Sequence, residues 1–189
     1  MSWPETARLK RLQLPKLLLA MSLAGLTAGC FQPLYGNQPA SGHGGIADKL
    51  DAVEVAPIAA PNGTRLARVG VSVRNELMYQ LTGGGAQAAT NYRLNVQLSS
   101  TNLQVIVDIN TARPDIQNYG IDAVYTLTDV TSGKPVITGQ TFSRVSYNIP
   151  GQQQRFAGDR GLRDAEDRAA KVIAENIRNR LASYFTAGT

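Results

Sequence analysis

Residues 65–98, RLARVGVSVRNELMYQLTGGGAQAATNYRLNVQL, contain the pattern that decides the fold. In the first half of this stretch, up to Leu81, apolar residues recur every three or four positions, which is typical of an amphipathic helix. Three glycines at 83–85 then end the helix. From Tyr92 to Leu98 apolar and polar residues alternate, as they do in a strand with one buried face. The stretch therefore predicts a helix that leads into a half-buried strand.

A first strand is predicted upstream, over Leu50–Ile58, where LDAVEVAPI alternates and Pro57 has no amide proton for a sheet. Turn residues follow at 61–63, and Thr64 is a suitable N-cap for the helix. A strand, a helix and a second strand in this order run parallel if both strands share one sheet.

The strand that starts at Tyr92 changes its apolar parity between Leu98 and Leu103. Since a shift of one position moves side chains to the other face, we expect a bulge or a break at Ser99–Asn102. Further patterns predict a turn at Asn110–Asp115, a strand at Tyr119–Leu127, a hairpin connection at Thr131–Pro135, a strand at Val136–Ile149 and a helix at Asp159–Phe185.

The last helix has an apolar face and an opposite face of charged i,i+4 pairs. Its predicted apolar residues are Leu162, Ala165, Ala169, Val172, Ile173, Ile177, Leu181, Tyr184 and Phe185. Two amphipathic helices need a surface on which to bury these faces. The sequence therefore predicts an α+β fold of order β-α-β-β-β-α, with two helices packed on one face of a four-stranded mixed sheet.

The N-terminus carries a secretion signal. Four basic residues precede an apolar run of 11 residues at Leu17–Thr27, too short to span a bilayer as a helix, and the run leads to the only cysteine, Cys30. The ending Thr27-Ala28-Gly29-Cys30 resembles the lipobox of bacterial lipoproteins, which implies cleavage before Cys30 and lipidation of its sulfur. We expect a signal peptide at residues 1–29, a lipidated cysteine and flexible tether at 30–48, and a periplasmic domain at 49–189.

The net charge of the mature chain is small. The whole sequence has a formal charge of +5, but four basic residues and one acidic residue belong to residues 1–29, so 15 basic and 13 acidic residues remain. A charge of +2 is weak support for nucleic-acid binding, and no nucleic-acid partner is expected.

The residues that begin the mature chain resemble a known family. The run Gly29-Cys30-Phe31-Gln32-Pro33-Leu34-Tyr35-Gly36 is similar to the start of the lipopolysaccharide-assembly lipoproteins of the LptE family, especially those of alphaproteobacteria. The resemblance implies a plug subunit inside the LptD β-barrel of the outer membrane, which assists barrel assembly and contacts lipopolysaccharide. Phe31 after the cysteine, instead of Asp, fits an outer-membrane location with the domain facing the periplasm or the barrel lumen.

Four arginines are the candidate lipopolysaccharide ligands: Arg65, Arg68, Arg113 and Arg155. The predicted topology puts the loops that carry them at the end of the domain opposite the lipid anchor. Guanidinium groups bind phosphate with two parallel hydrogen bonds, so these residues suit the phosphates of lipid A or core sugars. Each arginine could equally cap a loop or remain solvated.

The sequence has no pattern typical of an enzyme or a metal protein. The single histidine, His43, lies in the tether without acidic or cysteine neighbours at ligand spacing, and the single cysteine is consumed by lipidation. We therefore predict no catalysis, no cofactor and no metal site.

Two questions stay open at the level of sequence. An alternative function is an auxiliary lipoprotein of a phospholipid or other envelope ABC transport system. The strand residues Gln97, Ser99, Gln104, Tyr119 and Tyr147 could line an interface with a polar barrel lumen or could face water.

Overall fold

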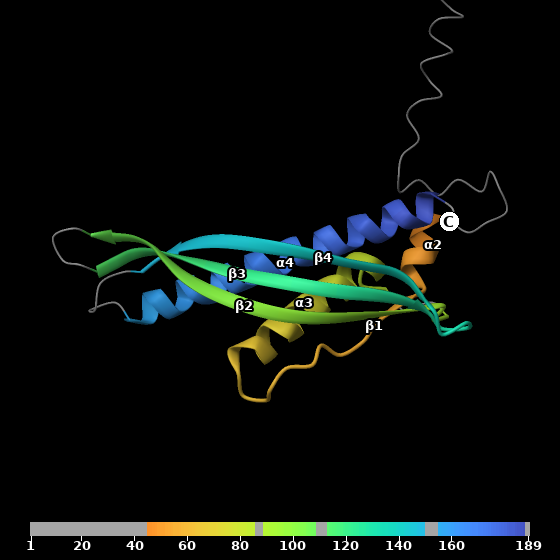
Figure 1. Cartoon of the computed structure of the whole chain (residues 1–189), viewed down its shortest axis with the longest axis horizontal. Coiled ribbons are helices and arrows are strands. Elements are labelled where there is room, and N and C mark those ends of the chain that lie inside the picture. Colours follow the sequence, from red (N-terminus) through yellow and green to blue (C-terminus); the bar gives the residue numbers. More distant parts are fainter. Residues whose placement is uncertain (1–44, 86–88, 109–112, 150–154, 188–189) are drawn as a thin grey trace, which may run out of the picture. The chain divides into compact units, whose positions relative to one another are not determined.

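We describe a computed structural model of the chain, which defines residues 45–85, 89–108, 113–149 and 155–187. The predicted signal peptide, Cys30 and His43 lie outside these residues. The described part runs in the order α2 (Ile46–Asp51), β1 (Val53–Val55), α3 (Arg65–Thr82), β2 (Tyr92–Asp108), β3 (Arg113–Asp129), β4 (Pro135–Asn148) and α4 (Arg155–Ala187) (Figure 1).

The four strands form one mixed sheet in the order β1-β2-β3-β4. β1 runs parallel to β2, with Val53 opposite Tyr92, because α3 carries the chain back between them. β2, β3 and β4 are antiparallel neighbours joined in sequence order. The predicted parallel pair and the predicted meander are both confirmed.

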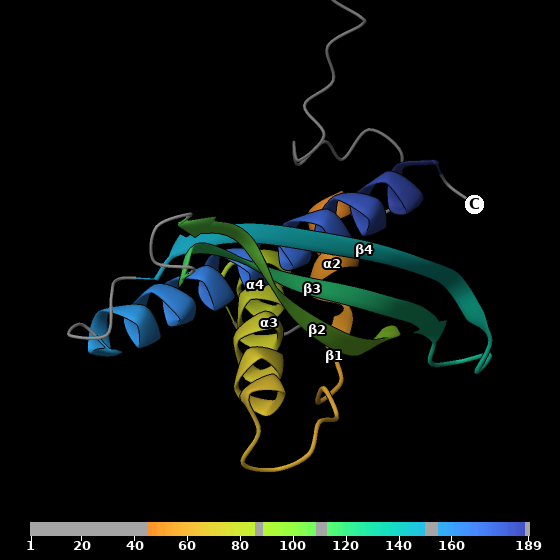
Figure 2. The same cartoon turned by 60° about the vertical axis from the view of Figure 1, so that its left-hand side comes forward.

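Helices α3 and α4 lie on the same face of the sheet, as two views show (Figures 1 and 2). Between the layers is one apolar core to which α3, α4 and alternate residues of the strands contribute. Its largest fully buried side chains are Tyr119, Leu77, Leu94, Ile121, Leu127, Ile173, Ile177, Leu181, Val53, Val69 and Val73. The predicted α+β fold, with two long helices on one face of a four-stranded sheet, is confirmed.

Helix α3 begins and ends where its sequence predicts. The Thr64 side chain accepts a hydrogen bond from the Ala67 amide at 3.2 Å, which satisfies one of the free donors of the first turn. At the other end Gly83 adopts a left-handed conformation with φ 64°, and its amide donates to the Tyr79 carbonyl.

The start of the domain differs from the prediction. Leu50 and Asp51 belong to the short helix α2 instead of to a strand, and β1 has only three residues. The Gly45 amide donates to the Asp48 carboxylate at 2.8 Å, which stabilises the first turn of α2, and Leu50 is buried in the core. The segment from Leu50 to Val55 has too few positions for its apolar pattern to separate a helical turn from a strand.

The parity change in β2 is accommodated differently from our expectation. Pairing with β3 continues without a shift through Ser99–Asn102, and the irregularities fall between Gln104 and Val107. Leu103 therefore projects to the face away from the helices, where 63% of its surface is exposed. Arg113–Asp115, predicted as part of a turn, instead begin β3.

Helix α4 is longer than predicted at both ends, and the predicted apolar face is buried except at two positions. Val172 is 40% exposed, because Ala169 and Ile173 occupy the centre of the buried stripe and leave Val172 at its margin. Tyr184 is partly buried and packs edge-on against Phe185.

No helix in the described ranges is both long enough and apolar enough to cross a membrane.

Candidate functional site

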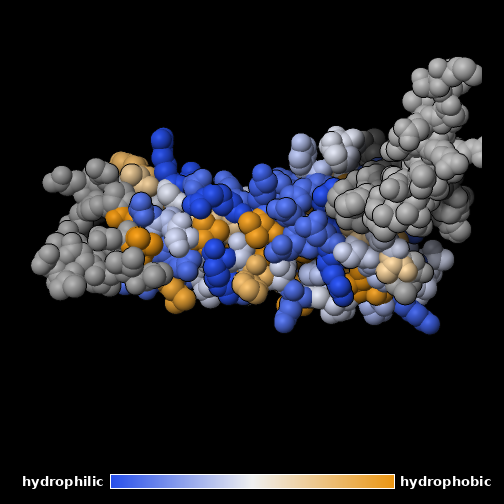
Figure 3. Space-filling model, turned by 90° about the horizontal axis from the view of Figure 1, so that it is seen from above, coloured by the Kyte–Doolittle hydropathy of each residue, from blue (hydrophilic) through white to orange (hydrophobic). Residues whose placement is uncertain are grey.

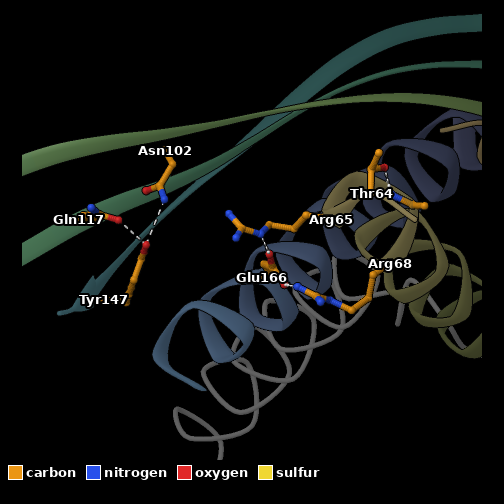
Figure 4. A network of polar contacts seen from close by, with 8 residues as sticks. Thr64, Arg65, Arg68, Asn102, Gln117, Tyr147 and Glu166 are labelled. Carbon is orange, nitrogen blue, oxygen red and sulfur yellow. Dashed lines mark hydrogen bonds and ion pairs between the residues drawn. The ribbon is translucent and has the colours of Figure 1, made fainter. Parts of the chain in front are cut away.

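A buried carboxylate joins the two long helices. Glu166 of α4 meets two arginines from the first turn of α3: Arg68 Nη2 donates to Oε2 at 2.5 Å, and Arg65 Nε lies 3.4 Å from Oε1 (Figure 4). Only 3% of the Glu166 side chain is exposed, whereas 52% of Arg65 and 49% of Arg68 are exposed. We call these three residues the arginine cluster.

The position of the arginines explains why a buried acid is tolerated here. The first turn of α3 has no acidic residue, and cations near a helix N-terminus are opposed by the positive end of the helix dipole. Glu166 supplies the missing negative charge from the neighbouring helix. Since one carboxylate faces two guanidinium groups, the cluster has a net charge of +1, and each arginine retains donors that face solvent.

Tyr119 of β3 places a polar group next to the cluster. The residue is 1% exposed, and its hydroxyl makes no hydrogen bond of good geometry with any described residue. Burial raises the pKa of Tyr119; nearby Ser100 and the two arginines act against this rise, whereas the Glu166 charge adds to it. The side of the cluster that faces the sheet is therefore a dry, polar environment.

A second polar group lies on the same face of the sheet. Asn102 Nδ2 donates to the Tyr147 hydroxyl at 3.0 Å, and this hydroxyl donates to Gln117 Oε1 at 2.5 Å (Figure 4). Three neighbouring strands each contribute one side chain, so the bonds hold β2, β3 and β4 together where the apolar core ends.

The structure brings two of the four predicted arginines together. Arg65 and Arg68 share Glu166, whereas Arg113 starts β3 opposite Asp108 and Arg155 starts α4. Arg113 is six residues from Tyr119, about 20 Å along a strand. Arg155 is eleven residues from Glu166, about 16 Å along a helix. The structure describes the backbone of Arg113 and Arg155 but not their side chains.

Two of the polar strand residues are not on an outer surface. Tyr119 and Tyr147 are 1% and 7% exposed and face the helices, because they share the parity of the core residues in β3 and β4. They therefore neither line an outer interface nor face water. Gln97, Ser99 and Gln104 are exposed.

Glu166 belongs to this site but was not predicted from the sequence. A signal was present, because Leu162, Glu166 and Ala170 follow one another at helical spacing and place an acid within the buried face of α4. A buried charge is stable only with a partner. Identifying Arg65 and Arg68 as the partners required the packing of α3 against α4.

The other face of the sheet has no helix on it among the described elements. Arg144 lies flat across Gly120, donates to Asp122 Oδ1 at 2.7 Å and to the Ile121 carbonyl at 3.1 Å, and has its guanidinium carbon 5.5 Å from the Phe142 ring centre. Figure 3 looks onto a different side, from above the β4 edge of the sheet, where apolar residues are scattered among polar ones.

The described residues contain no group of three or more His, Cys, Asp or Glu side chains close enough to hold a metal ion. Chemically, the arginine cluster is suited to holding an anion at its exposed arginines.

Comparison with known proteins gives a family and a fold. The family model LptE, described as lipopolysaccharide-assembly, matches residues 50–181. No curated protein matches significantly. A solved lipoprotein structure from Caulobacter crescentus is similar with TM-score 0.58 and 20% identity, over 75% of this chain and 96% of that chain. Rare lipoprotein B from Shewanella oneidensis is similar with TM-score 0.51 and 14% identity, over 71% and 96%.

At these identities the two structures support the fold alone, and both share the layered arrangement of this chain. The family model spans the region from the end of α2 to the last turns of α4, well over half of the sequence. The chain therefore belongs to the LptE family of lipopolysaccharide-assembly proteins.

Proposed function

We propose that this chain is an outer-membrane lipoprotein that plugs the LptD barrel, assists its assembly and binds lipopolysaccharide during transport to the cell surface. The observation that carries the proposal is the match of the family model to residues 50–181. Acyl chains on Cys30 would anchor the domain to the inner leaflet of the outer membrane. Since the proposed role is binding and support, no catalytic group is required.

The arginine cluster is the proposed contact for lipopolysaccharide. Arg65 and Arg68 are about half exposed, and their free donors can form paired hydrogen bonds with phosphate. The N-terminus of α3 adds its dipole to their attraction for an anion. Arg113 and Arg155 are proposed as further contacts, near the β2–β3 connection and at the start of α4.

The uncovered face of the sheet is the proposed contact for the barrel. The interior of an outer-membrane barrel is polar and wet, so a sheet face of mainly polar side chains suits it. Most outward residues of β2, β3 and β4 are hydroxyl and amide side chains: Asn95, Gln97, Ser99, Thr101, Thr126, Thr128, Thr138 and Gln140. The exposed apolar residues Leu103, Val124 and Phe142 lie among them.

Lipopolysaccharide capture tests the role of the cluster. The triple variant Arg65→Gln/Arg68→Gln/Glu166→Gln removes the cations together with the buried acid, so that no buried charge loses its partner. Arg93→Gln is the matched control, because it also lowers the net charge by one and removes only an exposed pair with Glu54. Both are made in the mature lipoprotein and compared by circular dichroism.

We expect the triple variant to capture about tenfold less lipopolysaccharide than Arg93→Gln, since hydrogen bonds to charged groups each contribute about 1.5–3 kcal/mol. Equal capture by two folded variants would remove Arg65 and Arg68 from the site. Co-purification from detergent extracts tests the barrel. A stable complex with LptD supports the proposal, and an inner-membrane ABC complex instead contradicts it.

A further inference from the structure

One edge of β2 is paired over only a small part of its length. β3 pairs with β2 from Tyr92 to Asp108, but on the opposite edge β1 pairs with only three residues, Tyr92, Arg93 and Leu94. Pro57 then takes the chain away from the sheet, and β1 lies beside the beginning of β2 alone (Figure 1). The edge from Val96 to Gln104 is left without a neighbouring strand in the described parts of the chain.

Two backbone hydrogen bonds define which backbone groups of β2 face this edge. The Leu94 carbonyl accepts from the Ala56 amide at 3.0 Å on the β1 side, and the Asn91 carbonyl accepts from the Val130 amide at 3.0 Å on the β3 side. Because backbone groups alternate along a strand, the amides and carbonyls of Leu98, Ser100 and Asn102 point to the open edge. No backbone or side-chain group among the described residues bonds with them there.

Within the described ranges no helix covers this edge, and no charged side chain protects it. Helix α4 packs against β3 and β4, and α3 packs mainly against α4 and less against β1 and β2. All six residues from Ser99 to Gln104 are exposed. Natural edge strands usually carry charges or proline against pairing with another chain, yet no charged residue or proline occurs between Arg93 and Asp108. Only the irregularities between Gln104 and Val107 limit the edge.

We propose that the β2 edge from Val96 to Gln104 receives an extended segment of the barrel partner as an added strand. Up to about nine residues of this segment would pair with β2. These residues are expected to be uncharged, because β2 has no charged side chain opposite them. This edge lies next to the uncovered face of the sheet, which is the proposed contact for the barrel, so one partner can bind the edge and the face together. The inference therefore rests on the proposed function.

Two other occupants fit this edge less well. Residues 31–44 of the predicted tether contain Pro33, Pro39 and three glycines, which interrupt strand pairing. A second copy would pair about a two-fold axis near Ser100. This arrangement would bring together two arginine clusters of net positive charge, because each cluster lies by Tyr119 and hence near the residues of β2 that pair with it.

Amide hydrogen exchange tests the added strand in the purified complex with the barrel. We expect the amides of Leu98, Ser100 and Asn102 to exchange at least about tenfold more slowly in the complex than in the free lipoprotein. The amides of Ser99 and Thr101 should be slow in both, because they already pair with β3. This alternation distinguishes an added strand from contact through side chains.

A pair of variants at Ser100 separates the backbone from the side chain. Ser100→Pro removes the amide that faces the open edge and leaves the bonds to β3, whereas Ser100→Ala keeps the amide. Both should keep their circular dichroism. The proline variant should bind the barrel at least about tenfold more weakly than the alanine variant.

The outcomes separate this inference from the proposed function. A stable complex in which the three amides exchange as in the free protein overturns the added strand and leaves the plug intact. Failure to form any complex overturns the proposed function. Protection of these amides in the free protein that rises with its concentration assigns the edge to a second copy and overturns our choice of partner.

Discussion

Single glycines in this sheet provide space for specific side chains. A Cβ at Gly139 would lie 2.5 Å from the Tyr125 hydroxyl oxygen and 2.6 Å from its Cζ, and Tyr125 is a buried ring. A Cβ at Gly120 would lie 2.6 Å from Thr101 Oγ1 and 2.8 Å from Arg144 Cδ. The Arg144 side chain is 38% exposed, so it can move into solvent.

We expect Gly139→Ala to destabilise the protein more than Gly120→Ala. The first forces an aromatic ring out of a packed core, which costs about 1–3 kcal/mol. The second displaces a flexible side chain and loses its exposed pair with Asp122, which is worth about 1 kcal/mol or less. Urea unfolding of both variants measures the difference. An equal loss would mean that Tyr125 adjusts as easily as Arg144.

At the scale of the element, the turn between β3 and β4 is held by one carboxylate. Asp129 Oδ1 accepts from the Ser132 amide at 2.7 Å, the Asp129 carbonyl accepts from the Gly133 amide at 2.9 Å, and Gly133 has φ 67°. The Ser132 amide, helped by the Ser132 hydroxyl, lowers the pKa of Asp129 below its usual value of 3.8. The ionised form is therefore favoured in the folded state.

The turn should contribute less stability in acid. Because the folded pKa of Asp129 is depressed, its contribution is present above pH 3.8 and is lost as the pH falls through the folded pKa. Asp129→Asn cannot titrate, so the advantage of the wild type over this variant should shrink between about pH 6 and about pH 2.5. Thermal unfolding of both proteins across this range measures it. A constant difference would mean that the charge of Asp129 contributes nothing to the turn.

At the scale of the whole molecule, the predicted attachment at Cys30 determines where the domain works. The sequence predicts cleavage before Cys30 and acylation of its sulfur, and both events alter the mass of the chain. We expect intact-mass analysis of membrane-extracted protein to show a chain that begins at Cys30 with added acyl groups. Cys30→Ser should retain residues 1–29 and gain no acyl mass. An unmodified sulfur in the wild type would contradict lipid anchoring.

Local periodicity was sufficient for much of the fold. The repeat of Leu66, Val69, Val73 and Leu77 and the alternation from Tyr92 to Leu98 follow directly from helix and strand geometry, so both elements were correct to within a residue or two where they began. The parallel and antiparallel pairings then followed from the order of the elements. A segment as short as 50–55 carried too few positions to separate a helical turn from a strand.

The order of the four strands and the two long helices, and the family, were thus determined by the sequence, because both depend on neighbouring residues. Only the tertiary structure decided that Glu166 meets Arg65 and Arg68, since they are about a hundred residues apart and join through helix packing. It also decided that β1 ends early and leaves half of β2 with an open edge. Such contacts join residues that are far apart in the sequence, and the periodicity of apolar residues does not predict which of these residues meet.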